Sequence, residues 1–256
     1  MSCPMPSCRR LAAGLVALLV SASPLAAQSF DFHAPAATRG ALEAEILNGA
    51  NLGSSKGDRE FLRNAHEAKL SYGISNAWQV ELGALLENPE NGDTRLARIT
   101  SANIIVLSPV RKEGIGLGLF AGADIATYEA THSQLIFGPI AQLNAGAAEL
   151  LVNPFFERAV GPNSEPGLAL NYVWRGKYEL SHSFAFGAVG HGRIENIGAP
   201  QAFSAQDHRL GPALFFEVEM EAHRKVEISL GVMAGLTQAA PAASVMLNLG
   251  IPLGRK

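Results

Sequence analysis

The stretch that decides the fold is Ile115-Gly116-Leu117-Gly118-Leu119-Phe120-Ala121-Gly122-Ala123-Asp124-Ile125. Its odd-numbered residues are all apolar, whereas its even-numbered residues, apart from Phe120, are glycine or aspartate. Successive side chains of a β-strand point to opposite faces, so this period of two predicts a strand with one apolar and one polar face. A tilted strand needs about 9–11 residues to cross a membrane, and this stretch is long enough.

The same alternation recurs along most of the chain, and no segment shows a sustained apolar repeat of the helical period. Each alternating segment ends in a turn-forming sequence. The pattern predicts an all-β fold, an up-and-down antiparallel transmembrane β-barrel of about 12 strands. The expected strands lie near residues 41–48, 64–73, 77–86, 94–107, 114–127, 133–144, 147–158, 167–175, 178–192, 208–222, 224–235 and 243–251.

The links between the expected strands alternate between short and long. The short ones lie at 74–76, 108–113, 145–146, 176–177 and 222–223, and the long ones at 49–63, 87–93, 159–166, 193–207 and 236–242. A membrane barrel with short periplasmic turns and longer outer loops produces this alternation and leaves both termini in the periplasm. A soluble β-sandwich has no reason to sort its links by length, so the alternation favours the barrel.

The first 27 residues have the organisation of a secretory signal peptide. Arg9 and Arg10 precede an apolar run over 11–20, and small residues with Pro24 lead to a predicted cleavage site after Ala27. The apolar run is too short for a membrane-spanning helix. We therefore expect export and a mature chain, residues 28–256, that forms one β-barrel domain in the bacterial outer membrane.

Composition excludes several classes of function. Cys3 and Cys8 both lie in the leader, so the mature chain has no thiol for a disulfide, a thiolate metal site or a catalytic nucleophile. With the two leader arginines removed, 18 basic residues face 23 acidic ones, which argues against nucleic acid as a partner. The seven histidines form neither an HxH nor an HExxH pattern, so we expect no metal and no other cofactor.

Two histidine–serine neighbours, His132-Ser133 and His182-Ser183, raise the question of a hydrolase. Adjacent residues of a strand point to opposite faces, so neither pair can form a catalytic dyad by itself. Gly116 and Gly118 lie within an expected strand with no helix after them, so they do not form a phosphate-binding loop. We therefore expect no enzymatic activity.

The polar face of the expected strands is rich in charge. A charged side chain facing lipid costs about 2–4 kcal/mol near the middle of a membrane, so these rows are expected to face the lumen. The candidate lumen-lining residues are Glu43, Glu45, Glu67, Lys69, Glu81, Asp124, Arg175, Glu179, Arg209, Glu217, Glu219, Glu221, Lys225 and Glu227. Two interpretations stay open: ion pairs plug a rigid barrel, or surplus acidic charge, concentrated at Glu217, Glu219 and Glu221, lines a passage that favours cations.

Several short motifs resemble one family of outer-membrane barrels. They are Leu70-Ser71-Tyr72-Gly73-Ile74-Ser75-Asn76 with Trp78-Gln79-Val80-Glu81-Leu82, Leu151-Val152-Asn153-Pro154-Phe155-Phe156-Glu157, His208-Arg209-Leu210-Gly211-Pro212-Ala213-Leu214, and Gly235-Leu236-Thr237-Gln238-Ala239-Ala240-Pro241. They are similar to the barrels grouped around the meta-pathway of phenol degradation and span most of the mature chain. The resemblance implies a barrel that moves small, often hydrophobic compounds, and it implies no catalytic residues. The C-terminal residues 249–256 depart from the usual pattern, because no aromatic residue ends the last strand.

We therefore expect a passive outer-membrane channel or transporter for small compounds, hydrophobic ones included. Its expected partners are outer-membrane lipid and a small-molecule solute. Two alternatives stay open. One is a structural or adhesive outer-membrane barrel with a plugged lumen, and the other is a soluble periplasmic binding barrel of the lipocalin kind, which also alternates apolar and polar residues.

Overall fold

The computed structural model describes residues 30–53, 62–89, 93–128, 132–161, 164, 167–220 and 225–253. These residues form twelve β-strands and one short 3-10 helix, η1 (Phe203–Ala205). The strands are β1 (Leu42–Leu52), β2 (Leu62–Ser75), β3 (Trp78–Pro89), β4 (Arg95–Ser108), β5 (Gly114–Ala126), β6 (Ser133–Ala145), β7 (Ala148–Val160), β8 (Ala169–Ser181), β9 (Phe184–Ile194), β10 (Asp207–Glu219), β11 (Lys225–Gly235) and β12 (Ala243–Pro252). No helix within the described ranges is long and apolar enough to span a membrane.

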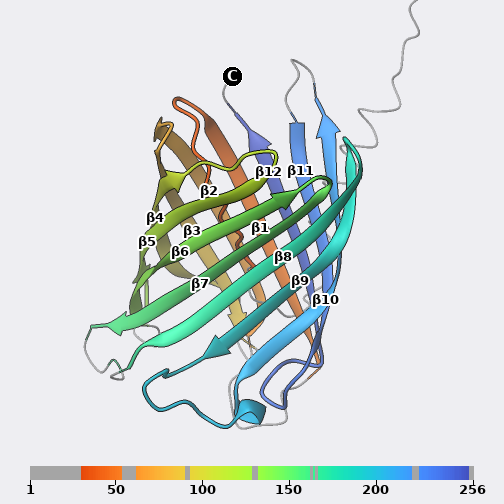
Figure 1. Ribbon diagram of the computed structural model, residues 1–256. Coiled ribbons are helices and arrows are strands. Elements are labelled where there is room, and N and C mark those ends of the chain that lie inside the picture. The colour runs from red at the N-terminus through yellow and green to blue at the C-terminus, as the bar shows by residue number, and fades with distance from the viewer. Residues whose placement is uncertain are drawn as a thin grey trace, which may run out of the picture.

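The twelve strands close into one antiparallel barrel (Figure 1). Each strand pairs with its neighbours in the chain, and β12 returns to pair with β1 from Glu43 opposite Pro252 to Leu52 opposite Ala243. Closure removes the unpaired sheet edges that would otherwise leave backbone donors and acceptors without partners. The predicted all-β, up-and-down barrel of about 12 strands is confirmed.

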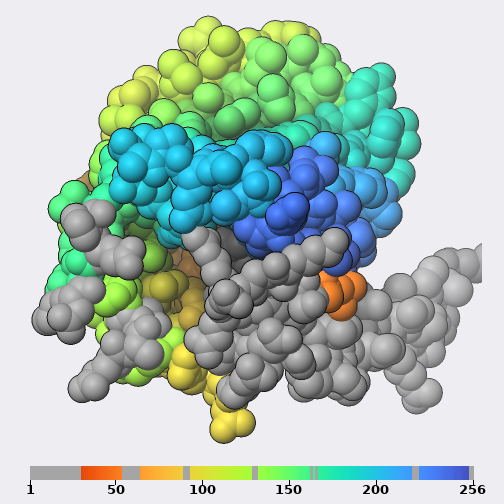
Figure 2. Space-filling view, turned by 90° about the horizontal axis from the view of Figure 1, so that it is seen from below, coloured from red at the N-terminus to blue at the C-terminus, as the bar shows by residue number. Residues whose placement is uncertain are grey.

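Short and long links alternate between the two ends of the barrel, as predicted. At one end, called here the short-turn end, two-residue turns join β2 to β3, β6 to β7 and β8 to β9. The opposite end, the long-link end, carries the links 195–206 and 236–242, which lie side by side and share a hydrogen bond from Ala239 N–H to Ser204 O (Figure 2). The predicted turn at 222–223 and residues 54–61 of the first long link lie outside the described residues.

One predicted turn is wrong. The alternation placed a turn at Gly176-Lys177, but β8 continues to Ser181 and the chain turns at His182-Ser183. A two-residue turn preserves the alternation, because even-numbered side chains face outward on both β8 and β9. The pattern therefore does not locate the turn by itself. Glu179 belongs to the end of β8 rather than to a strand over 178–192.

The barrel wall separates charged from apolar side chains. Apart from Arg95 at the start of β4 and Arg158 near the end of β7, every charged side chain that the structure describes in the strands belongs to an inward-facing row. The outward rows expose large apolar side chains: Leu82 is 61% exposed and Leu107 is 60% exposed. The charged side chains of the strands therefore point into the barrel, whereas its outer surface is apolar.

Residues 30–41 are called here the lumen segment: residues 30–35 lie inside the barrel, and residues 38–40 are exposed at the short-turn end, where Arg39 N–H donates to Asn76 Oδ1 at 3.0 Å. Phe30 is 1% exposed and His33 is 6% exposed, values that are usual in a protein core. The segment starts against the wall formed by β9 to β12 and contacts β7 at Asn153. It reaches the wall again where Gly40 N–H donates to Gly73 O at 2.7 Å. The lumen segment therefore crosses the lumen from one side to the other.

Candidate functional site

The lumen segment begins with an apolar anchor. Phe30 packs against the inward rows of β9 to β12, where its neighbours are Ala185, Val189, Ala213, Phe215, Met233 and Met246. Val189 and Met246 are 0% exposed, so this patch is as dry as a protein core. Full burial of a phenylalanine side chain contributes about 1.5–3 kcal/mol. Asn248 Nδ2 also donates a hydrogen bond to the Phe30 carbonyl at 2.6 Å, and the Arg209 guanidinium lies 5.7 Å from the centroid of the Phe30 ring. This side of the segment is therefore held mainly by apolar packing.

The middle of the lumen segment is held by one amide. The Asn153 side chain on β7 accepts a hydrogen bond from the His33 backbone N–H at 2.8 Å and donates one to the His33 carbonyl at 2.9 Å. Asn153 is 0% exposed. The His33 ring lies against Phe120 and Phe155, at centroid distances of 4.6 and 5.7 Å. The amide replaces the strand neighbour that this buried backbone lacks.

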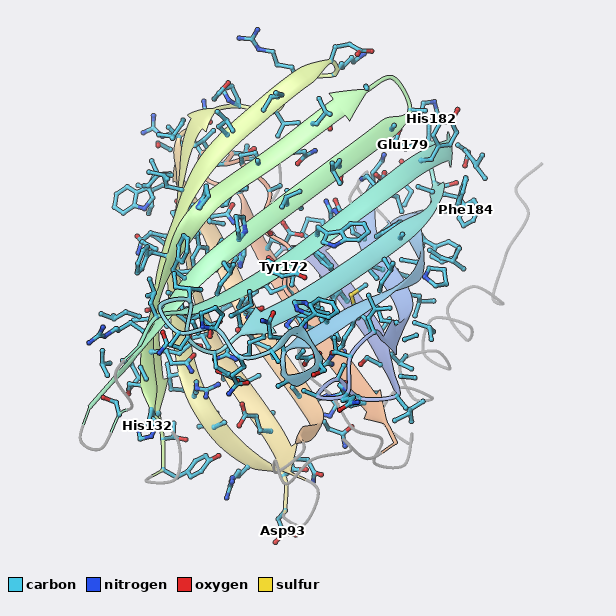
Figure 3. All side chains as sticks on the ribbon, turned by 60° about the horizontal axis from the view of Figure 1, so that its bottom comes forward. Asp93, His132, Tyr172, Glu179, His182 and Phe184 are labelled. Atoms are coloured by element: carbon cyan, nitrogen blue, oxygen red, sulfur yellow. The ribbon has the colours of Figure 1, made fainter. Side chains whose placement is uncertain are left out.

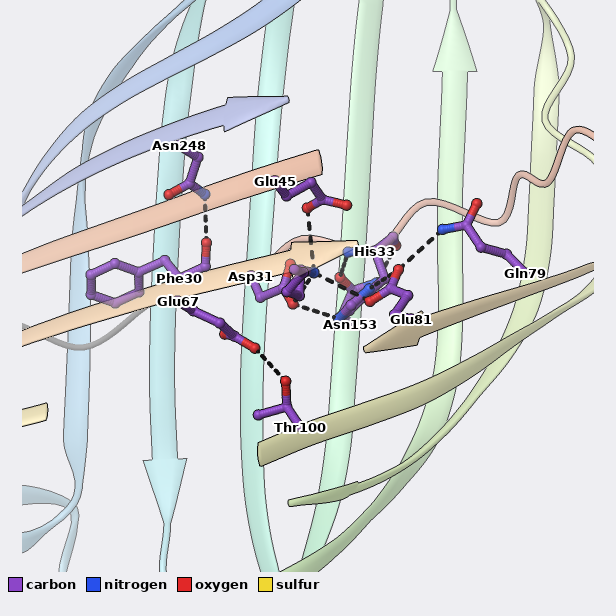
Figure 4. A network of polar contacts seen from close by, with 11 residues as sticks. Phe30, Asp31, His33, Glu45, Glu67, Gln79, Glu81, Thr100, Asn153 and Asn248 are labelled. Carbon is purple, nitrogen blue, oxygen red and sulfur yellow. Dashed lines mark hydrogen bonds and ion pairs between the residues drawn. The ribbon is translucent and has the colours of Figure 1, made fainter. Parts of the chain in front are cut away.

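The opposite side of the segment is an ionic cluster formed by Asp31, His33, Glu45, Lys69 and Glu81 (Figure 4). The Lys69 Nζ atom lies 2.6 Å from Asp31 Oδ2, 3.2 Å from Glu81 Oε2 and 3.3 Å from Glu45 Oε2. The side chain of Lys69 is 3% exposed, so carboxylates surround its ammonium in place of water. The cluster fastens the lumen segment to β1, β2 and β3.

His33 supplies the second positive charge of the ionic cluster. Burial by itself lowers the pKa of a histidine, but the charges of Asp31 and Glu81 outweigh that effect and raise the pKa of His33 to about 10. Burial tends to raise the pKa of Asp31, yet His33 and Lys69 hold the pKa of this carboxyl well below its ordinary value. Both groups of the lumen segment are therefore charged at neutral pH.

The ionic cluster resembles a metal site only in its residue types. Ligand atoms of Asp31, His33 and Glu81 lie within 4.8 Å of one another. The Lys69 ammonium contacts both of these carboxylates and supplies the positive charge that a metal ion would bring. The geometry is that of an ion-pair network with its own cation.

Further ion pairs line the lumen on both sides of the segment. They join Arg98 to Glu87 at 3.2 Å, Arg175 to Glu149 at 2.9 Å, Lys177 to Glu149 at 3.1 Å, Arg193 to Glu157 and to Glu195, and Arg209 to Asp207. Arg209 Nη1 also donates to Asn51 Oδ1 at 2.6 Å and to Ser244 Oγ at 2.9 Å. Arg209 thereby connects β10 with β1 and β12, across the barrel closure.

The predicted lumen residues divide into two groups by position. Those near the lumen segment are Glu45, Glu67, Lys69, Glu81, Asp124, Arg175 and Arg209, whereas Glu43 lies at the start of β1, opposite Ser71 and Pro252. Those toward the short-turn end are Glu179, Glu217, Glu219, Lys225 and Glu227, where Lys225 pairs with Glu217 and both are largely exposed. Glu221 lies outside the described residues. The structure brings Glu45, Lys69 and Glu81 together and leaves the acidic repeat of β10 apart from them.

Sequence reasoning missed the residues that close the lumen. Asp31 and His33 precede the first strand, where no alternation marks them, and Asn153 was not singled out. Arg98 lies on the inward row of β4, with Thr100, Ala102 and Ile104. It escaped notice because this row is largely apolar, so β4 lacks the alternation that marked the other strands.

A cavity of about 440 Å³ lies between the lumen segment and the long-link end. Its lining includes Asp31 and His33 from the segment, Glu67 and Asp124 from one wall, and His191 from the other. Glu67 accepts a hydrogen bond from Thr100 at 2.9 Å (Figure 4). The lumen is therefore hollow on this side of the segment and polar along its walls.

The two histidine–serine neighbours lie at opposite ends of the barrel. Figure 3 shows His182 beside Glu179 and Phe184 at the short-turn end, and His132 at the end that carries Asp93. His182 is in a turn, and His132 directly precedes β6. The structure does not bring these pairs together.

Two solved structures are similar to this chain, and the first of them shares its fold. An outer membrane channel from Pseudomonas putida F1 matches with a TM-score of 0.59 and 11% identity, over 88% of this chain and 99% of that chain. A bacterial polysaccharide outer membrane secretin matches with a TM-score of 0.41 and 7% identity, over 85% of this chain and 100% of that chain. No family model matches the sequence, and no curated protein matches it. The likeness to the channel shows the fold alone, so the resemblance to the phenol-degradation barrels stays a prediction.

Proposed function

We propose that this chain is an outer-membrane barrel that admits small compounds and that the lumen segment closes it at rest. The observation that carries the proposal is the sorting of side chains across the wall, with ion pairs inside and an apolar surface outside. Soluble monomers rarely expose large contiguous apolar surfaces, whereas a lipid-facing barrel wall requires one. Strands of 10 to 14 residues are long enough for the apolar part of a membrane.

Cell fractionation tests the location. The mature chain, without residues 1–27, is expected to sediment with outer membranes after a carbonate wash and to change its gel mobility on heating. Recovery in the soluble periplasmic fraction would instead support a soluble binding barrel.

Arginine substitutions on the outer surface of the barrel test whether that surface faces lipid. Leu82 faces outward near the middle of β3, whereas Leu253 directly follows β12. In lipid, Leu82→Arg is expected to lower the free energy of unfolding by about 2–4 kcal/mol and Leu253→Arg by about 0–1 kcal/mol. If water surrounded the barrel, both changes would stay within about 0.5 kcal/mol. Equilibrium unfolding from lipid vesicles measures the difference.

Passage of small compounds is supported by the hollow on the long-link side and by the polar lumen. The channel from Pseudomonas putida F1 that shares the fold agrees with this role. The lumen segment stands in the way, so passage requires that it leave the apolar anchor, the ionic cluster or both. No catalytic role is proposed.

A second candidate is a structural barrel with a permanent plug. The buried Lys69 and Phe30 favour it, because both sides of the lumen segment are closely packed. Planar-bilayer recordings of the purified barrel separate the two functions. Brief ion currents are expected if the segment moves, and a folded, inserted barrel that stays silent at all voltages would support the structural role.

A further inference from the structure

The cavity between the lumen segment and the long-link end has an excess of negative charge. Its lining holds eight carboxylates against four lysine or arginine side chains and the charged His33. The arginines already form ion pairs: Arg98 pairs with Glu87, and Arg193 pairs with Glu157. One wall, formed by β2 to β5, carries Glu67, Glu87 and Asp124 against Arg98 on β4. A positively charged ligand would lower the repulsion among these carboxylates.

His191 on β9 gives an independent indication of a ligand. It lines the cavity and is 1% exposed, yet neither of its ring nitrogens has a hydrogen-bond partner in the part of the chain that the structure describes. Its ring contacts Phe30 edge-on at 5.5 Å, and Val173 and Arg209 lie opposite it on the neighbouring strands. Buried polar groups in folded proteins are nearly always paired, so an unpaired buried imidazole that lines a cavity calls for a partner within that cavity.

The other buried atoms without a hydrogen-bond partner indicate which hydrogen-bonding groups a ligand would need. Asp31 Oδ1 and Asn171 Oδ1 line the same cavity and are buried without a hydrogen-bond partner, and both can only accept. A neutral His191 adds one acceptor nitrogen and one N–H donor, and Arg98 Nε is a second unpaired donor, so these atoms comprise three acceptors and two donors. The cavity therefore offers more acceptors than donors, and a ligand rich in N–H groups fits it.

We propose that this cavity binds a small organic ammonium ion. The carboxylates of β2, β3 and β5 face its charge, while His191, Asn171 and Asp31 accept hydrogen bonds from its nitrogens. Phe120, Ile136, Phe155 and Val173 also line the cavity and receive its hydrocarbon part. A cavity of about 440 Å³ lies in the size range of small-molecule sites. The inference rests on the proposed passage for the route by which the ligand arrives, and its binding is measured separately.

Three probes of equal length test the charge requirement. Titration calorimetry on the purified, folded barrel in detergent compares 1,5-diaminopentane, 1,5-pentanediol and glutarate. The diamine is expected to bind at least about tenfold more tightly than the diol, and glutarate is expected not to bind. Equal binding of all three probes, or no binding of the diamine, would overturn the proposal.

Matched variants locate the site. Asp124→Asn and His191→Phe remove a charge and two nitrogens with little change of shape, and each is expected to weaken diamine binding by about tenfold. Glu219→Gln makes the same carboxylate-to-amide change at the short-turn end and is expected to leave binding unchanged. Equal weakening by Glu219→Gln would reveal non-specific charge attraction and reject the site. Asn171→Ala gives a second measure if His191→Phe fails the heat-mobility test of folding.

Conductance measured on the same purified barrel distinguishes failure of the cavity site from failure of the proposed passage. Diamine binding in a barrel that never conducts would support the cavity site and contradict the proposed passage of small compounds. Conductance in a barrel that binds the diamine no more tightly than the diol would support the passage and contradict the cavity site.

Discussion

The two anchors of the lumen segment hold it by different physics. On the β9–β12 side, Phe30 is buried among apolar side chains. On the β1–β3 side, Asp31 and His33 are held by Lys69 and Glu81 in a network of charges. Apolar burial changes little with pH, whereas a buried ion-pair network is stable only while each charge keeps its partner. We infer that the apolar anchor supplies most of the free energy that holds the segment in place. The ionic cluster sets the pH range over which the segment stays in place.

Removing the apolar anchor is expected to have the largest effect. Phe30→Ala leaves a cavity among Val189, Met233 and Met246 and should cost the seated segment about 3–5 kcal/mol. Hydrogen exchange of residues 30–41 in detergent measures this loss of protection. Phe203→Ala, at a ring that is 64% exposed, is the control and should change nothing. Unaltered exchange in Phe30→Ala would mean that the ionic cluster alone seats the segment.

Removing the cation of the ionic cluster comes next. Lys69→Met leaves three buried carboxylates without their shared partner, and the cost of breaking such a network is about 3–5 kcal/mol. We expect the lower end of that range, because protonation of a carboxylate relieves part of the repulsion. The same exchange experiment, repeated at two pH values, checks it. The loss should shrink at acid pH, and a loss independent of pH would contradict the ionic account.

The central amide is expected to contribute less than either anchor. Asn153→Leu keeps an apolar side chain of similar size but leaves the His33 N–H and carbonyl without their partner. The expected cost is about 1–3 kcal/mol per unpaired group, reduced if water enters. Exchange of the His33 amide should rise more than that of its neighbours, and a uniform rise along the segment would show that the amide acts through general packing.

The pH dependence of the ionic cluster has a definite sign. The pKa of His33 is raised to about 10 from an ordinary value of 6.5, so its contribution is fully present below pH 6.5 and is lost as the pH rises through 10. The lowered pKa of Asp31 gives the opposite limit: its contribution is present above its ordinary value of 3.8 and is lost in stronger acid. Compared with His33→Gln, the wild-type segment should lose its advantage in protection between pH 6.5 and 10. A constant difference over that interval would refute a charged His33.

The smallest effect is expected at the short-turn end. Lys225 and Glu217 form an ion pair whose side chains are 55% and 39% exposed, and solvent screens such exposed pairs, so they stabilise little. Glu217→Gln with Glu219→Gln should therefore leave protection of the lumen segment unchanged, while it lowers any cation preference of the current modestly. A large change in protection would show that the acidic repeat communicates with the segment.

The alternation predicted the barrel well, because most strands record in their own sequence which face points outward. Ile115 to Ile125 is enough to identify β5, and the lengths of the links identify the two ends. The turn at His182-Ser183 escaped because a two-residue turn leaves the parity unchanged.

The closure of the lumen depends on contacts that no local pattern records. His33 meets Asn153 across 120 residues of sequence, and Asp31 meets Lys69 on a strand whose own pattern indicates only that Lys69 faces inward. Lys69 and Glu81 were therefore among the candidates, but nothing in the sequence indicated that they would hold a segment from outside the strands.

The most direct test of the account is to lock the lumen segment in place. A Cβ atom on Gly118 would lie 3.2 Å from Cβ of Pro35, close to the 3.5–4.5 Å of a disulfide, so Pro35→Cys with Gly118→Cys can fasten the segment to β5. The account predicts no ion current across planar bilayers from the oxidised double variant, current of wild-type size after reduction, and no effect of oxidant on Pro35→Cys alone. Equal current before and after reduction would contradict it, because ions would then pass without movement of the segment.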